Sequence, residues 1–148
     1  MTGDVAPSER QPGILILTHG AVGNEMIRSA EMIMGPLEGV TALSLMPGVG
    51  ADSFAEEVKC RVETMPEGSL ILTDIFGGTP ANTAALVSQT KEIVAISGLS
   101  LSMLIEAVSS RSTLRGEGLA QAVLEAGRSG CRNITAEIRE VQLGETIT

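Results

Sequence analysis

The chain has 148 residues, a formal net charge of −8 and a hydrophobic fraction of 43%, which suits one domain with a sizeable buried core. It contains no basic run, two Phe and neither Trp nor Tyr, so the composition argues against nucleic acid as a partner. No apolar run approaches the ~20 residues of a membrane span. One His and two distant cysteines, Cys60 and Cys131, are too few for a zinc site and are typical of a reduced, cytoplasmic protein.

The elements are predicted in chain order from hydrophobic periodicity and turn residues. Residues 1–12 are polar and are expected to form a flexible N-terminal tail. Short apolar runs bounded by turn signals predict buried strands at 13–18, 40–46, 69–73 and 93–97. Apolar residues at helical spacing predict helices over 26–34, from a Ser53–Glu56 capping box to Met65, from a Thr79–Pro80 start to Val87, over 103–110 and over 119–126.

Four alternations of strand and helix with short connections predict the fold class. They indicate an α/β domain with an open, mainly parallel four-stranded sheet and helices on both faces. Ile134, Ala136 and Ile138 alternate like a last strand at the sheet edge. We expect one domain over residues 13–143, followed by a frayed C-terminus at 144–148.

The chemistry is predicted at the carboxyl ends of the strands, where ligands collect in sheets of this kind. The first strand ends in Thr18-His19-Gly20, and the third runs into Asp74. Neutral imidazole is a nucleophile, and a carboxylate that accepts its other N–H fixes which nitrogen keeps the lone pair. If the first and third strands are neighbours, Asp74 is placed for that role beside His19.

A phosphoryl group on His19 would carry negative charge. Backbone N–H groups at Gly20, at Gly77 and Gly78, and at the helix that starts at Thr79 are predicted to receive it. Each feature also has an ordinary explanation: a lone surface histidine, a turn aspartate, or a turn followed by a helix cap. The conjunction of these features favours the phosphoryl site.

The sequence lacks the motifs of nucleotide binding, dinucleotide binding and serine hydrolysis. The sequence has no P-loop, no G-x-G-x-x-G after the first strand and no G-x-S-x-G elbow. Thr18-His19-Gly20 is similar to the Arg-His-Gly of histidine phosphatases, but the chain has no second His, and Thr18 stands in the Arg position. We therefore expect no nucleotide, cofactor or metal of its own.

Four motifs together resemble a known family. They are ILTHG (residues 16–20), SAEMIMG (29–35), TDIFGGTPAN (73–82) and SGLSLSMLIEA (97–107). On these motifs, residues 13–130 resemble the mannose-family IIA component of the bacterial phosphoenolpyruvate:sugar phosphotransferase system.

The resemblance implies a protein-to-protein phosphotransferase. His19 would accept phosphate from phospho-HPr and pass it to a IIB component, Asp74 would hydrogen-bond that histidine, and the Thr79 hydroxyl would lie near the phosphoryl group. The family implies a cytoplasmic homodimer, peripheral to the inner membrane through the permease complex. It also implies a C-terminal strand that crosses to the partner subunit, for which residues 134–138 are the candidate.

The sequence is also compatible with two other functions. A regulatory IIA-like protein would be phosphorylated at His19 and signal that state to a kinase or regulator without sugar transport. A phosphocarrier subunit of a dihydroxyacetone kinase would carry Gly-Ser-Ala where this chain has Gly-Gly-Thr-Pro. The chain also departs from the family at Ser102, where a Pro is usual, which puts the rigidity of that loop in question.

Overall fold

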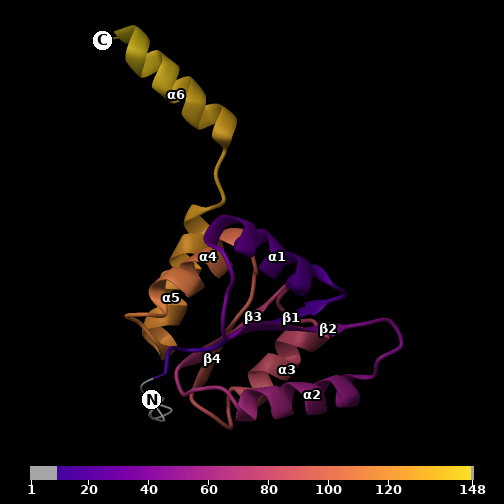
Figure 1. The fold of residues 1–148 in the computed structure, drawn as a ribbon. Coiled ribbons are helices and arrows are strands. Elements are labelled where there is room, and N and C mark those ends of the chain that lie inside the picture. Colours follow the sequence, from indigo (N-terminus) through magenta and orange to yellow (C-terminus); the bar gives the residue numbers. More distant parts are fainter. Residues whose placement is uncertain (1–9, 148) are drawn as a thin grey trace.

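The computed structural model describes residues 10–147 and contains one sheet of four parallel strands in the order β2-β1-β3-β4 (Figure 1). The strands are β1 (Ile14–His19), β2 (Val40–Leu45), β3 (Ser69–Thr73) and β4 (Ile93–Ile96). The predicted open parallel α/β fold is confirmed. Most of the expected N-terminal tail, residues 1–9, and the last residue of the expected frayed C-terminus lie outside the described residues.

The sheet is covered on both faces because its central strands are apolar on both sides. In β1, Ile14 and Ile16 point to one face and Leu15 and Leu17 to the other, and none of the four is exposed to solvent. Continuous apolar runs of this kind are typical of parallel strands between two helical layers. Helices α1 (Val22–Met34), α4 (Leu101–Ser110) and α5 (Gly116–Ser129) cover the first face, and α2 (Ala51–Glu63) and α3 (Thr79–Val87) cover the second.

Helices α1 to α5 each begin earlier than predicted. Helix α2 begins at Ala51 after an extended Gly50, so Ser53 lies inside the helix and makes no capping box. In α3 the N-cap is Gly78, and Thr79 is already helical. Helix α4 begins after Ser100, whose hydroxyl oxygen accepts the Met103 N–H at 3.2 Å. This cap fixes the start of α4. The loop before α4 is therefore defined although Ser102, in the first turn, replaces the family's Pro.

The C-terminal segment is a helix, and the predicted edge strand at 134–138 is wrong. Helix α6 (Ile134–Ile147) extends away from the sheet (Figure 1). The Asn133 side-chain oxygen accepts the Ala136 N–H at 2.9 Å and caps its start. Ile134, Ile138 and Val141 are also spaced as one stripe of a helix, a period that five alternating residues do not distinguish from a strand. Residues 134–138 are helical in this structure, so they offer no strand that could cross to a partner subunit.

The strand order places the functional edge. From β1 the chain moves to β2 on one side, then crosses back to β3 on the other, so the order reverses between β1 and β3. The connection after β1 leads to α1 on one face, and the connection after β3 leads to α3 on the opposite face. These connections diverge and leave the strand ends open between them, which is where ligands bind in such sheets. Leu17 pairs with Thr73, so His19 and Asp74 follow just beyond this pair.

Candidate phosphoryl site

His19 and Asp74 meet at this switch point. The His19 Nδ1 atom lies 2.8 Å from Asp74 Oδ2. The same oxygen accepts the backbone N–H of His19 at 2.9 Å, and Oδ1 accepts the N–H of Ile75 at 2.9 Å. These hydrogen bonds hold the carboxylate in one orientation and fix the imidazole against it.

The protonation of the pair follows from the environment of the carboxylate. Partial burial raises the pKa of Asp74, but the hydrogen bonds from His19 and Ile75, together with the charge of His19, outweigh it and set the pKa below its ordinary value. An ionised carboxylate only accepts hydrogen bonds, so Nδ1 carries the proton that lies between the two side chains. The lone pair of the neutral imidazole is then on Nε2.

The loop after β3 lies against the imidazole ring. A Cβ atom at Gly78 would stand 2.9 Å from His19 Cε1 and 3.4 Å from Nε2, so this position has no room for a side chain. Gly77 has φ +90°, a backbone conformation that disfavours other residues. Gly78 therefore brings the loop close to the nitrogen that carries the lone pair, and Gly77 supplies the turn that precedes it.

The backbone N–H groups predicted to bind an anion differ in whether they already donate a hydrogen bond. Within residues 10–147 the N–H groups of Gly77 and Gly78 donate no hydrogen bond, and they precede the N-terminus of α3, whose second position is Pro80. Thr79 is partly buried beside them as the first residue of α3. The Gly20 N–H, in contrast, donates to the Leu45 carbonyl at 2.9 Å, so this amide belongs to the β1–β2 pairing.

Thr18 has a positioning role that the sequence analysis missed. Its hydroxyl donates to the Gly20 carbonyl at 3.0 Å and accepts the Gly23 N–H at 3.1 Å. The side chain thus closes the turn that carries His19 from β1 into α1. A hydroxyl residue directly before a Gly-rich turn is the local signal that predicts such bonds.

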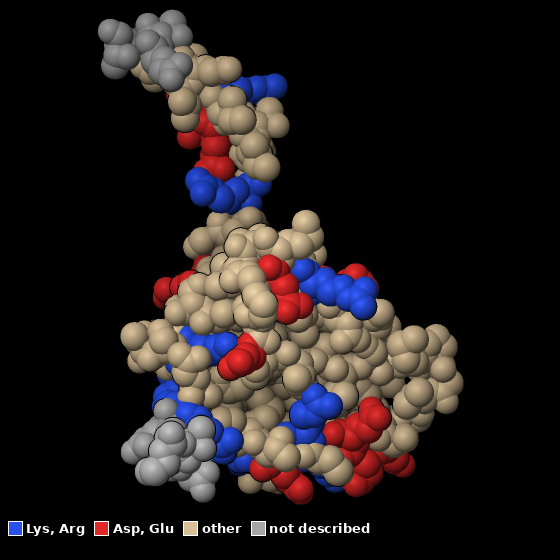
Figure 2. All heavy atoms as spheres, in the orientation of Figure 1, with Lys and Arg blue, Asp and Glu red and all other residues tan. Residues whose placement is uncertain are grey.

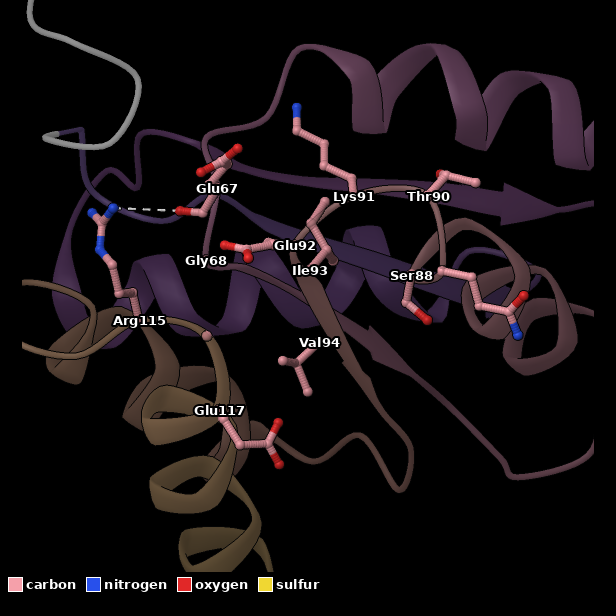
Figure 3. A pocket seen from close by; sticks show the side chains of 12 residues that line it. Glu67, Gly68, Ser88, Thr90, Lys91, Glu92, Ile93, Val94, Arg115 and Glu117 are labelled. Atoms are coloured by element: carbon pink, nitrogen blue, oxygen red, sulfur yellow. Dashed lines mark hydrogen bonds between the residues drawn. The ribbon is translucent and has the colours of Figure 1, made fainter.

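A wide cavity lies at the opposite, amino edge of the sheet, with a volume of about 780 Å³. Figure 3 shows its lining of charged side chains. The Arg115 guanidinium donates to the Glu67 carbonyl at 3.4 Å, and Lys91 Nζ donates to the carbonyls of Val62 and Glu63, each at 3.1 Å. Arg115 and Lys91 thus bind main-chain oxygens and hold neighbouring segments of the chain together.

Two negative findings apply to the described part of the chain. Its His, Cys, Asp and Glu side chains form no group of three that could hold a metal ion. None of its helices has the length and apolar character needed to cross a membrane.

Comparisons with known proteins agree with this geometry. A family model described as "PTS system fructose IIA component" matches residues 13–124. The sorbose-specific EIIA component of Klebsiella pneumoniae is 33% identical over 119 residues, which cover 79% of this chain and 87% of that protein. The mannose-specific EIIAB component of Escherichia coli K12 is 30% identical over 128 residues, 84% of this chain but only 40% of that protein. Phosphotransferase system component EIIA from Streptococcus agalactiae has a similar structure, with a TM-score of 0.80 at 31% identity, and the match covers 84% of this chain and 98% of that one.

Proposed function

The chain belongs to the mannose-family IIA components of the phosphoenolpyruvate-dependent sugar phosphotransferase system, and on this premise we propose that His19 is its phosphoryl carrier. The side chain accepts the phosphoryl group of phospho-HPr and passes it to a IIB protein. One observation carries the proposal: the 2.8 Å contact from Nδ1 to Asp74 leaves Nε2 as the free nucleophile of an exposed histidine.

The transfer needs a nucleophile, an aligned donor and a place for charge. The Nε2 lone pair forms a bond to phosphorus as the P–N bond in the donor breaks, and the electron pair of that bond returns to the donor imidazole. Positive charge thereby moves from the phosphorylated donor ring to the ring of His19. The ionised Asp74 carboxylate opposes this charge through Nδ1–H and keeps the ring in line.

The phosphoryl oxygens need partners that do not have to reorganise. The free N–H groups of Gly77 and Gly78, the positive end of the α3 dipole and the Thr79 hydroxyl are the groups proposed to receive them. The Gly20 N–H is left out of this set because it is bonded to Leu45.

The assembly of the protein is part of the same proposal. The family supports a cytoplasmic location, a homodimer, and contact with the membrane permease through the IIB protein. The chain spans about 40% of the length of the Escherichia coli EIIAB protein. The IIB acceptor is accordingly treated as a partner whose identity an experiment must establish.

A labelling experiment tests the function. The protein is incubated with phosphoenolpyruvate, enzyme I and HPr, and the label on it is measured by mass and by its acid lability. We expect one phosphoryl group on the wild type and none on His19→Ala. Equal labelling of His19→Ala would contradict the proposal. Adding a cognate IIB protein should discharge the label, whereas label that persists would favour the regulatory role over transport.

A further inference from the structure

Three successive peptide groups around His19 are each held by a different strand. The His19 N–H donates to Asp74 Oδ2 at 2.9 Å, just beyond β3. The Gly20 N–H donates to the Leu45 carbonyl at 2.9 Å, at the end of β2. The Gly20 carbonyl accepts the Thr18 hydroxyl at 3.0 Å, from β1 itself. The main chain that carries the imidazole is therefore fixed peptide by peptide, and the third of these bonds depends on the Thr18 side chain.

Gly20 needs this restraint because its backbone is permissive. Its φ is +60°, and a glycine has no Cβ to restrict its conformation. Residues 18–24 contain no Asp, Glu, Lys or Arg, so the His19–Asp74 pair is the only ion pair that this turn can make. Figure 2 shows the same lack of charge in the loop after β2, the uncharged lobe at the right of the view. The shape of the turn thus depends on its neutral hydrogen bonds.

Thr18 makes two of these bonds from a side chain that is completely buried. Besides donating to Gly20, its hydroxyl accepts the N–H of the buried Gly23 at 3.1 Å. A Cβ at Gly23 would stand 2.9 Å from Ile16 Cγ2, so α1 begins directly against the sheet. Without the hydroxyl, the Gly23 N–H would lose its partner in the interior, which is costly. We therefore expect the turn to change shape when the hydroxyl is removed.

Thr18 and the His19 ring lie on opposite faces of the sheet. Successive residues of a strand alternate between faces, so Thr18 lies on the side of α1, where it bonds to Gly23, and the ring lies on the side of α3, where Gly78 approaches it. The Gly20 carbonyl is bonded on the Thr18 side, which directs its partial negative charge away from the ring. A carbonyl oxygen turned toward the phosphoryl group would repel it.

We propose that the Thr18 hydroxyl is a positioning group for phosphoryl transfer: it keeps the Gly20 carbonyl turned away from His19 Nε2 and so sets the rate of the chemical step without contacting the ring. This inference rests on the proposed function and adds to it a residue on which the rate depends. Thr18 takes no part in the bond changes, and its side chain is buried, so it does not contact the donor protein. Its loss should slow the transfer and leave the affinity for the donor unchanged.

Single-turnover kinetics with phospho-HPr separate these two effects. The rate constant of His19 phosphorylation is measured against phospho-HPr concentration for the wild type, Thr18→Val and Thr18→Ser. Val keeps the shape of Thr without the hydroxyl, and Ser keeps the hydroxyl. We expect Thr18→Val to lower the maximum rate constant roughly 10-fold, with the half-saturating concentration within about twofold of the wild type. Thr18→Ser should recover most of the loss.

Ser69→Ala is the matched control. Ser69 is also fully buried in a strand, but at the amino edge, and its hydroxyl makes the same pair of bonds. It donates to the Pro66 carbonyl at 2.6 Å and accepts the Gly13 N–H at 2.8 Å. Ser69→Ala should lower the free energy of unfolding, as Thr18→Val does, and leave the maximum rate constant unchanged. If Thr18→Val does not fold, Thr18→Ala takes its place with the same expectation.

A spectroscopic measurement tests the positioning role without phosphorylation. Long-range ¹H–¹⁵N spectra of the single histidine at alkaline pH should show one tautomer, with the proton on Nδ1, in the wild type and Ser69→Ala, and a mixture of tautomers in Thr18→Val. An unlabelled wild type would refute the proposed function, whereas the tautomers would still report on Thr18.

Several results would overturn the role of Thr18. An unchanged maximum rate constant for Thr18→Val would do so, as would an equal loss in Ser69→Ala, which would trace the effect to stability alone. A change confined to the half-saturating concentration would place the effect in donor binding. A rate for Thr18→Ser no higher than that of Thr18→Val would show that the hydroxyl is not the group that matters. A single Nδ1–H tautomer in Thr18→Val would show that the ring is held without it.

Discussion

The two edges of the sheet use their polar groups in opposite ways. At the amino edge, beside the wide cavity, Lys91 and Arg115 donate to main-chain carbonyls and hold elements together. At the carboxyl edge, Asp74 commits one imidazole nitrogen and leaves Nε2 and the Gly77 and Gly78 amides without partners in the described chain. A cavity of about 670 Å³ also lies at the carboxyl ends of β3 and β4, where Phe76 and Gly77 line it. The edges therefore differ in how their polar groups are engaged and not in whether they hold a cavity.

The strongest test of the carboxyl edge is Asp74→Asn. Both carboxylate oxygens accept N–H groups, so an amide must turn its own NH₂ toward either Ile75 or His19, and it cannot oppose the charge on a phosphorylated ring. We expect the rate of labelling by phospho-HPr to fall roughly 10²-fold or more. Asp52→Asn, at an exposed acid in the first turn of α2, is the matched control and should keep the wild-type rate. Equal rates for the two variants would refute the role of Asp74.

A smaller effect is expected when the loop is pushed against the ring. In Gly78→Ala the added methyl group would stand 2.9 Å from His19 Cε1, so the ring or the loop must shift. The labelling rate should fall roughly 10- to 100-fold, as misplaced reacting groups do. Gly50→Ala changes the other extended glycine N-cap, at α2, where nothing lies within 4 Å of the new Cβ, and should have no effect on rate. A Gly78→Ala protein with full activity would show that the close approach has no function.

A substitution at the amino edge should lower the stability of the fold and leave the labelling rate of His19 unchanged. Lys91→Met removes the Nζ donor that serves the carbonyls at the end of α2 but keeps the apolar stem. We expect the free energy of unfolding to fall by about 1–3 kcal/mol in urea denaturation, with an unchanged labelling rate. Lys59→Met, which removes only an exposed pair with Glu56, should change stability far less. A loss of labelling in folded Lys91→Met would contradict the assignment of a purely structural role to the amino edge.

The smallest effect concerns pH. The pKa of Asp74 is lower in the folded chain than its ordinary value, so its ionised form favours folding at pH values above that ordinary pKa. This stabilisation is lost as pH falls below about 4 and through the folded pKa. Thermal unfolding measured between pH 7 and pH 3 should therefore show a shallower decline for Asp74→Asn than for the wild type. Parallel curves would indicate that the carboxylate has the same pKa in both states.

The sequence predicted the parts of the molecule that local pattern determines. The ILIL run of β1 is apolar on both faces, and a strand of that kind belongs between helical layers. His19 and Asp74 were predicted together because parallel strands end at one edge, and the strand order β2-β1-β3-β4 makes their strands neighbours. The prediction for residues 134–138 was wrong because alternation and helical spacing coincide over so few residues. The Gly20 amide pairs with Leu45 on a neighbouring strand, which no local pattern specifies. The Thr18 hydroxyl bonds only within its own turn, so the hydroxyl before a Gly-rich turn was an available signal that was not used.

The role of the His19–Asp74 pair is tested most directly by the identity of the phosphorylated nitrogen. Long-range ¹H–¹⁵N correlation spectra of the single histidine, recorded before and after loading by phospho-HPr, distinguish the two ring nitrogens. We expect phosphorylation at Nε2, with Nδ1 protonated toward Asp74 in both states. A phosphoryl group on Nδ1 would contradict it, because that nitrogen is the one held 2.8 Å from the carboxylate.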